Sequence, residues 1–164
     1  MSMILNLFRV TPAELETYLT DSSLLAAEVY NDEKPNPKLT DIDKAWEGIL
    51  FLLTGENSYN SVHELTPVIF GKQTLDPTQE LGYGPAMFST PQEVAELHQK
   101  LAGIAPSDLK ARFSPDEMTR KDVYPNIWAD NELAFDFLAV YFQKVQEIYA
   151  EAAKNGEAII TFLH

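Results

Sequence analysis

The chain has 164 residues, no cysteine and a formal net charge of −13, from 12 basic and 25 acidic side chains. This length suits one domain with a buried core, and a hydrophobic content of 45% is that of a globular protein. The missing cysteines exclude disulfides, thiol nucleophiles and thiolate metal sites. The negative charge excludes nucleic acids and anionic membranes as favoured partners. It serves either solubility alone or the binding of a basic protein partner.

Targeting signals are not evident in the sequence. No stretch reaches the ~18 apolar residues that cross a bilayer. The opening segment MSMILNLFRV has no basic region and no small-residue cleavage site, so we expect no signal peptide. These features favour a soluble, cytoplasmic protein.

The first quarter of the chain predicts a strand, two helices and a loop. Residues 3–10 are mostly apolar, which is typical of a buried strand. Helices are expected over residues 12–19, where Thr11 and Glu14 have the spacing of a capping box, and over residues 22–30. Pro35 and Pro37 break both periodicities, so the next segment is a loop.

The stretch LTDIDKAWEGILFLLTG predicts a third helix. Thr40 is the expected N-cap, and Gly55 lies just past the last turn. The end of this helix is apolar on all sides and is therefore expected to be buried. Lys44 lies one turn from Asp41 and from Glu47, a spacing that favours ion pairs.

The middle of the chain is less regular. Residues 67–70 are ambiguous between a strand and a helical turn. The segment ELGYGPAMF, residues 80–88, is interpreted as a strand with glycine kinks. It leads into a helix that Thr90 caps, and a short helix follows over residues 108–113.

The last third predicts an aromatic loop, the longest helix and a final strand. The loop is VYPNIW, residues 123–128, and the helix covers residues 131–154 before the sequence Asn-Gly. Residues 157–164 form the strand. The expected buried stripe of the long helix is Leu133, Phe137, Tyr141, Val145, Ile148 and Ala152.

The order of these elements predicts a sheet covered by helices. Strands at both ends and in the middle, separated by helices, are typical of an α/β architecture. No internal repeat or linker divides the chain, so residues 1–164 are expected to form a single compact domain.

A series of motifs resembles a bacterial family, the YfbM-like family. The motifs are DIDKAW followed by LLTG, then GYGPA, TPQEVAEL, VYP and a long terminal helix followed by AII. The resemblance spans nearly the whole chain and implies a three-layer α/β/α sandwich. We expect a small mixed sheet, with the long C-terminal helix before the last strand. The family is a domain of unknown function and brings no catalytic residues with it.

Motifs for catalysis and metal binding are weak. His63, His98 and His164 lack a partner at the spacing of a zinc helix, so neither a metal site nor a cofactor is expected. No nucleophile elbow, P-loop or dinucleotide-binding motif occurs. Glu132 and Asp136 lie one helical turn apart, but such carboxylate pairs arise by chance in an acidic chain.

Aromatic residues at the motif positions provide the candidate binding site. They either pack in the core or line a cleft that binds a flat or apolar ligand. The glycines of GYGPA would let a ligand approach the backbone closely, and charged residues at the start of the third helix would lie at the rim. The candidate residues are Asp43, Lys44, Trp46, Tyr83, Tyr124 and Trp128.

Two hypotheses for function follow. The first is a non-enzymatic interaction protein that binds a basic protein partner through its acidic surface. The alternative is a small-molecule-binding protein or a hydrolytic enzyme, with an aromatic and acid-lined cleft near the GYGPA and VYP segments.

Overall fold

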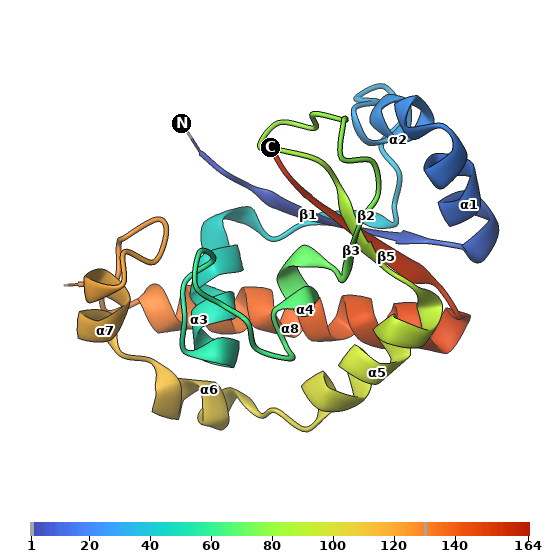
Figure 1. Cartoon of the computed structure of the whole chain (residues 1–164). Helices are drawn as coiled ribbons and strands as arrows, with labels where there is room; N and C mark the ends of the chain where they lie inside the picture. Colours follow the sequence, from blue (N-terminus) through green and yellow to red (C-terminus); the bar gives the residue numbers. More distant parts are fainter. Residues whose placement is uncertain (1, 130) are drawn as a thin grey trace.

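A computed structural model describes residues 2–129 and 131–164, and it is built around one five-stranded sheet (Figure 1). The strand order is β2-β1-β5-β4-β3. The strands are β1 (Leu5–Val10), β2 (Leu39–Asp41), β3 (Gln73–Thr74), β4 (Met87–Ser89) and β5 (Ala158–Leu163).

The α/β architecture is confirmed, but the expectation of a mixed sheet is wrong. Each of the four strand pairings within the described residues is antiparallel. A single crossover helix would have joined parallel neighbours. Here two helices lie between β1 and β2, and several lie between β4 and β5.

Helices cover both faces of the sheet, which makes three layers (Figure 1). One face carries α1 (Pro12–Thr20) and α2 (Ser22–Val29), and its cluster includes Phe8 and Ile160. The other face packs against the larger helical layer, and its cluster includes Leu7 and Ile159. That layer contains the 3-10 turn η1 (Asp43–Ala45) and helices α3 (Trp46–Thr54), α4 (Pro67–Phe70), α5 (Pro91–Ala102), α6 (Pro106–Arg112), α7 (Pro115–Arg120) and α8 (Ala134–Asn155).

The long helix α8 is the centre of the larger core. The expected burial of Val145, Ile148 and Ala152 is confirmed, but the first half of the predicted stripe is wrong. Leu133 is 70% exposed and precedes the helix, and Phe137 and Tyr141 are only partly buried. In this half, the buried face of α8 is shifted by one residue toward the C-terminus, because α3 and Trp128 pack against Leu138. The side chains buried instead are Ala134, Leu138 and Phe142.

Within residues 2–129 and 131–164, no helix has both the length and the apolar character needed to cross a bilayer.

The capping boxes predicted at two helix starts are confirmed. Thr11 accepts the N–H of Glu14 at 3.1 Å, and the Glu14 carboxylate accepts the N–H of Thr11. Thr90 and Glu93 form the same pair of bonds at the start of α5. These local bonds satisfy N–H groups that a helix leaves free, which is why the sequence alone indicated them.

The predicted cap at Thr40 is wrong. Thr40 lies in β2, opposite Leu7 of β1, because this segment pairs with an edge of β1. The turn that follows is held by Asp41, which accepts the N–H of Asp43, and by Asp43, which accepts the N–H of Lys44. The third helix therefore begins at Trp46.

The strand expected over residues 80–88 is also shorter than predicted. Only Met87–Ser89 is a strand, and GYGPA is a loop. Gly82 has a φ of 109°, and a Cβ there would lie 2.7 Å from the Cα of His164. The loop passes this close to the chain end because the N–H of Tyr83 donates to the carbonyl of Leu163 at 3.0 Å.

A chain of charged groups joins the sheet to α1 and to the loop before β2. The buried carboxylate of Glu157 accepts hydrogen bonds from Arg9 at 2.7 Å and from Lys38 at 3.3 Å, and Lys38 also bonds to Glu14 at 3.0 Å. Burial raises the pKa of Glu157, but the hydrogen bonds from Arg9, Asn155 and Lys38 outweigh it and leave the pKa lowered. Glu157 is therefore ionised in the folded protein.

We expect Gly48→Ala to lower the free energy of unfolding by about 1–2 kcal/mol. Alanine favours helix by about 1 kcal/mol, but a Cβ at this position would lie 2.6 Å from Leu138 and 2.7 Å from Trp128. Urea denaturation measures the change. Gly103→Ala is the matched control, since its φ is −83° and the nearest atom would be 3.9 Å away. A Gly48→Ala protein as stable as the wild type would contradict the tight packing.

We expect Glu157→Gln to destabilise the protein at pH 7 and much less near pH 3. The pKa of Glu157 is lower in the folded protein than in the unfolded chain, where it is about 4.3. The stabilisation by the Glu157 carboxylate is therefore complete above the unfolded pKa and is lost as the pH falls through the folded pKa. Urea denaturation at both pH values tests this. The exposed Glu16→Gln is the control, and a Glu157→Gln effect that does not shrink in acid would disprove the linkage.

Candidate functional site

The candidate site is a cleft at the start of α3, with a volume of about 610 Å³. That volume is within the range of small-ligand pockets. The cleft lies where α3 meets the loop between α3 and α4, the segment after α7, the GYGPA loop and the end of β5. Its lining is Met3, Trp46, Glu47, Ser58, Tyr59, Phe70, Tyr83, Asp122, Tyr124, Pro125, Asn126 and Leu163.

Stacked aromatic rings form one wall of the cleft. The ring centroids of Trp46 and Tyr124 are 5.6 Å apart at an interplanar angle of 27°, and Phe70 contacts Trp46 edge-on at 5.8 Å. The Trp46 indole N–H donates to the carbonyl of Met3 at 3.1 Å, and the Tyr124 hydroxyl accepts the N–H of Met3 at 2.8 Å. Both polar groups of the Met3 backbone are thus bonded, so this wall is firmly positioned.

The carboxylate of Glu47 lies at the base of the same wall and is only 3% exposed. One oxygen accepts the N–H of Ser58 at 2.6 Å, and the other accepts the N–H of Tyr124 at 2.7 Å. Glu47 is also in the first turn of α3, where the helix dipole favours a negative charge. Backbone N–H groups, rather than a cationic side chain, therefore hold this buried charge.

The ion pair expected between Lys44 and Glu47 is wrong. No ion pair of Lys44 or of Glu47 lies within 4 Å in the part of the chain that the structure describes. The reason is that Glu47 points toward the two loops whose N–H groups it accepts, whereas Lys44 precedes α3 in the 3-10 turn.

The cleft is electrostatically negative. Its lining contains two carboxylates, Glu47 and Asp122, and none of the described residues that line it is Lys, Arg or His. The rim is aromatic, since Tyr59 is 93% exposed and Tyr83 is 42% exposed. Aromatic faces and carboxylates both attract cations, so the site is suited to a positively charged group with an apolar body.

The structure brings together three of the six residues predicted from sequence. Trp46, Tyr83 and Tyr124 line the cleft. Trp128 does not, because it is buried in the core, where its indole N–H donates to the carbonyl of Val123 at 2.7 Å. Asp43 and Lys44 lie in the turn before α3, outside the lining.

The sequence reasoning missed the central residue. The sequence predicts an ion pair between Glu47 and Lys44, although Gly48 and an apolar run follow Glu47. An acid at the start of a helix that is buried on all sides is itself a signal, because such a group must find hydrogen-bond donors nearby. Tyr59 and Asp122 carried no comparable signal, since they lie in polar loops whose course depends on Glu47.

The described lining residues include one serine and two carboxylates, Glu47 and Asp122. Ser58 is the only Ser or Thr among the described lining residues, and no imidazole accompanies it as a base. Within residues 2–129 and 131–164, no cluster of three or more His, Asp or Glu side chains is arranged to hold a metal ion.

The family of the chain is shown by comparison with known proteins. Residues 1–162 match the domain of unknown function DUF1877. The chain belongs to this family. Protein YfbM of Escherichia coli strain K12 is 23% identical over 128 residues, which cover 75% of each chain. The predicted YfbM-like resemblance is therefore confirmed.

A solved structure of the relative has the same fold. The crystal structure of YfbM from Escherichia coli, a protein of unknown function, matches with a TM-score of 0.78. The match covers 98% of this chain and 99% of that chain, at 19% sequence identity. This likeness shows the fold alone, and the family brings no activity with it.

We expect Glu47→Gln to lower the free energy of unfolding by about 1–3 kcal/mol. A glutamine has one acceptor oxygen, so its amide N–H₂ would face one of the two backbone N–H groups and leave that group unpaired. Chemical denaturation measures the loss. Glu56→Gln is the control, since its carboxylate is more exposed and pairs with Lys121, and it should cost under about 1 kcal/mol. Equal effects would mean that the bonds of Glu47 contribute little.

Proposed function

We propose that this protein is a non-catalytic, cytoplasmic binding protein whose cleft takes a cationic side chain from a basic protein partner. The observation that carries the proposal is Glu47, a buried carboxylate beside the cleft with no cationic partner among the described residues. A lysine or arginine that enters the cleft supplies the missing opposite charge.

The energetic argument starts from the cost of burying a charge. An ionised carboxylate taken out of water loses several kcal/mol, and hydrogen bonds from backbone N–H groups offset only part of that loss. A cation in the cleft adds a Coulombic attraction that is little screened by solvent. The accessible rings of Tyr59, Tyr83 and Tyr124 add an attraction of about 0.5–1 kcal/mol each where a cation lies over the ring face.

The rest of the surface supports a protein partner. The net charge of −13 accelerates encounter with a basic protein and repels acidic ones. Tyr59, which is 93% exposed, places an aromatic ring in water at the rim of the cleft. Tyrosine is enriched at protein interfaces, where its ring is buried by the partner. The absence of cysteines, which form disulfides in an oxidising compartment, supports the proposed cytoplasmic location.

A free organic amine would use the same contacts as a lysine side chain. The experiment therefore compares three probes by calorimetry at low salt: a peptide that alternates lysine with glycine, the same peptide with acetylated lysines, and butylamine. Saturable binding of the first alone supports a basic protein partner. Binding of butylamine as tight as that of the peptide supports a small-molecule ligand instead. Equal binding of the acetylated peptide, or no binding of either peptide, overturns the proposal.

We expect Tyr59→Ala to weaken binding of the lysine peptide about two- to fivefold, the loss of one cation–π contact at an exposed site. Tyr59→Phe should bind as the wild type does, because it keeps the ring. Val62→Ala, an equally exposed position in the same loop but outside the lining, is the matched control. If Tyr59→Ala binds the peptide normally, the peptide attaches to the acidic surface elsewhere and not in the cleft.

A further inference from the structure

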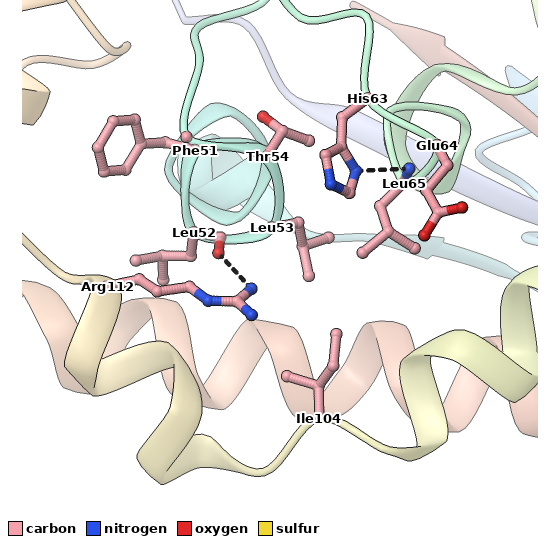
Figure 2. Close-up of a pocket in the computed structure, with 10 residues that line it drawn as sticks. Phe51, Leu52, Leu53, Thr54, His63, Glu64, Leu65, Ile104 and Arg112 are labelled. Carbon is pink, nitrogen blue, oxygen red and sulfur yellow. Dashed lines mark hydrogen bonds between the residues drawn. The ribbon is translucent and has the colours of Figure 1, made fainter.

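A second cleft, of about 500 Å³, lies at the opposite end of α3 (Figure 2). The last turn of α3, the loop before α4, the connection from α5 to α6, and α6 itself all contribute to it. Its floor is hydrocarbon: Leu52, Leu53 and Leu65 belong to the buried core, and Ile104 packs against that core. This floor favours a ligand with an aliphatic part.

Arg112 is the charged group of this cleft. Its Nη1 donates to the carbonyl of Leu52 at 3.1 Å, which holds the guanidinium over the last turn of α3 (Figure 2). A guanidinium has five N–H donors, and this is the one hydrogen bond of the Arg112 side chain to the described residues. Its remaining donors are available to a ligand.

The pairing of the three arginines makes Arg112 distinct. Arg9 pairs with Glu157, and Arg120 pairs with Glu117. Arg112 has no carboxylate within 4 Å in residues 2–129 and 131–164, although the chain contains 25 acidic side chains. An unpaired guanidinium above an apolar floor, in a protein of net charge −13, is a candidate anion-binding group.

His63 adds a second donor to the cleft. Its Nδ1 accepts the N–H of Leu65 at 3.0 Å, so the neutral imidazole carries its proton on Nε2 and donates from there. Figure 2 shows His63 and the guanidinium of Arg112 on either side of Leu53. The one carboxylate of the lining, Glu64, forms an ion pair with Lys100 at 3.0 Å, which offsets its charge at the rim.

We propose that this second cleft binds a small aliphatic carboxylate, with its anionic end on Arg112 and its hydrocarbon chain on Leu53 and Ile104. A monocarboxylate fits better than a phosphate, because the last carbonyl groups of α3, before its C-cap Gly55, repel a multiply charged anion more strongly than a singly charged one. The planar guanidinium also matches a carboxylate in shape.

The test uses hexanoate as the probe, with acetate and 1-hexanol as comparators that lack the chain or the charge. Calorimetry and amide NMR shifts should show that hexanoate binds at least about tenfold more tightly than either comparator. The shifts should be largest at Leu53, Gly55 and Leu65. Hexanoate binding no tighter than that of 1-hexanol, shifts centred elsewhere, or no saturable binding overturns the proposal.

Arg112→Gln should weaken hexanoate binding at least about tenfold and leave 1-hexanol binding unchanged. The side chain is exposed, so the variant should fold, and its urea midpoint verifies this. Arg120→Gln is the matched control, since it removes an exposed arginine outside the lining. If both variants bind hexanoate as the wild type does, Arg112 is not the anion-binding group. If Arg112→Gln shifts the urea midpoint markedly, Arg112→Lys is measured as a second variant. We expect its affinity for hexanoate to lie between those of the wild type and Arg112→Gln.

Discussion

Two hydrogen bonds that the Glu47 carboxylate accepts hold both loops that form the aromatic cleft. Ser58 belongs to the loop between α3 and α4. Tyr124 belongs to the segment after α7 and lies 66 residues after Ser58 in the chain. Neither segment has regular structure at these points that would pair its backbone N–H groups. The positions of Tyr59, Asp122 and Tyr124 in the cleft therefore depend on one side chain of α3.

The helix that carries Glu47 is itself positioned by side-chain packing. Gly48 lets Leu138 of α8 and the indole of Trp128 approach the backbone of α3 more closely than any Cβ would allow. Trp128 follows Tyr124 by four residues, so the same segment is held twice, by a hydrogen bond at Glu47 and by burial at Trp128. An acid at the first turn of α3 and an arginine over its last carbonyl groups both agree with the helix dipole.

How much of the fold could be predicted from the sequence depends on how far apart in the chain the partners of each interaction lie. The caps at Thr11 and Thr90 were predicted because both partners of each bond lie three residues apart. The strand at Leu39–Asp41 was missed because its stability comes from β1, more than thirty residues earlier, and Thr40 therefore resembled a helix cap.

Of the candidate site, Trp46, Tyr83 and Tyr124 were found as aromatic residues at turns. Trp128 was misplaced because nothing local shows whether an aromatic side chain points into a cleft or into the core.

The negative charge of the cleft follows from the need to pair two backbone N–H groups of its loops. The two groups to be satisfied, the N–H of Ser58 and the N–H of Tyr124, are both donors, and only a side chain with two acceptor atoms meets them together. A carboxylate does so at full strength, whereas an amide has one acceptor and an apolar side chain has none. An acid at position 47 thus meets the needs of both loops, and it leaves a negative charge beside the cleft wall with no described cationic side chain to neutralise it. The cation affinity that we propose for the cleft is therefore a consequence of how its loops are held, because the group that fixes the geometry also sets the charge.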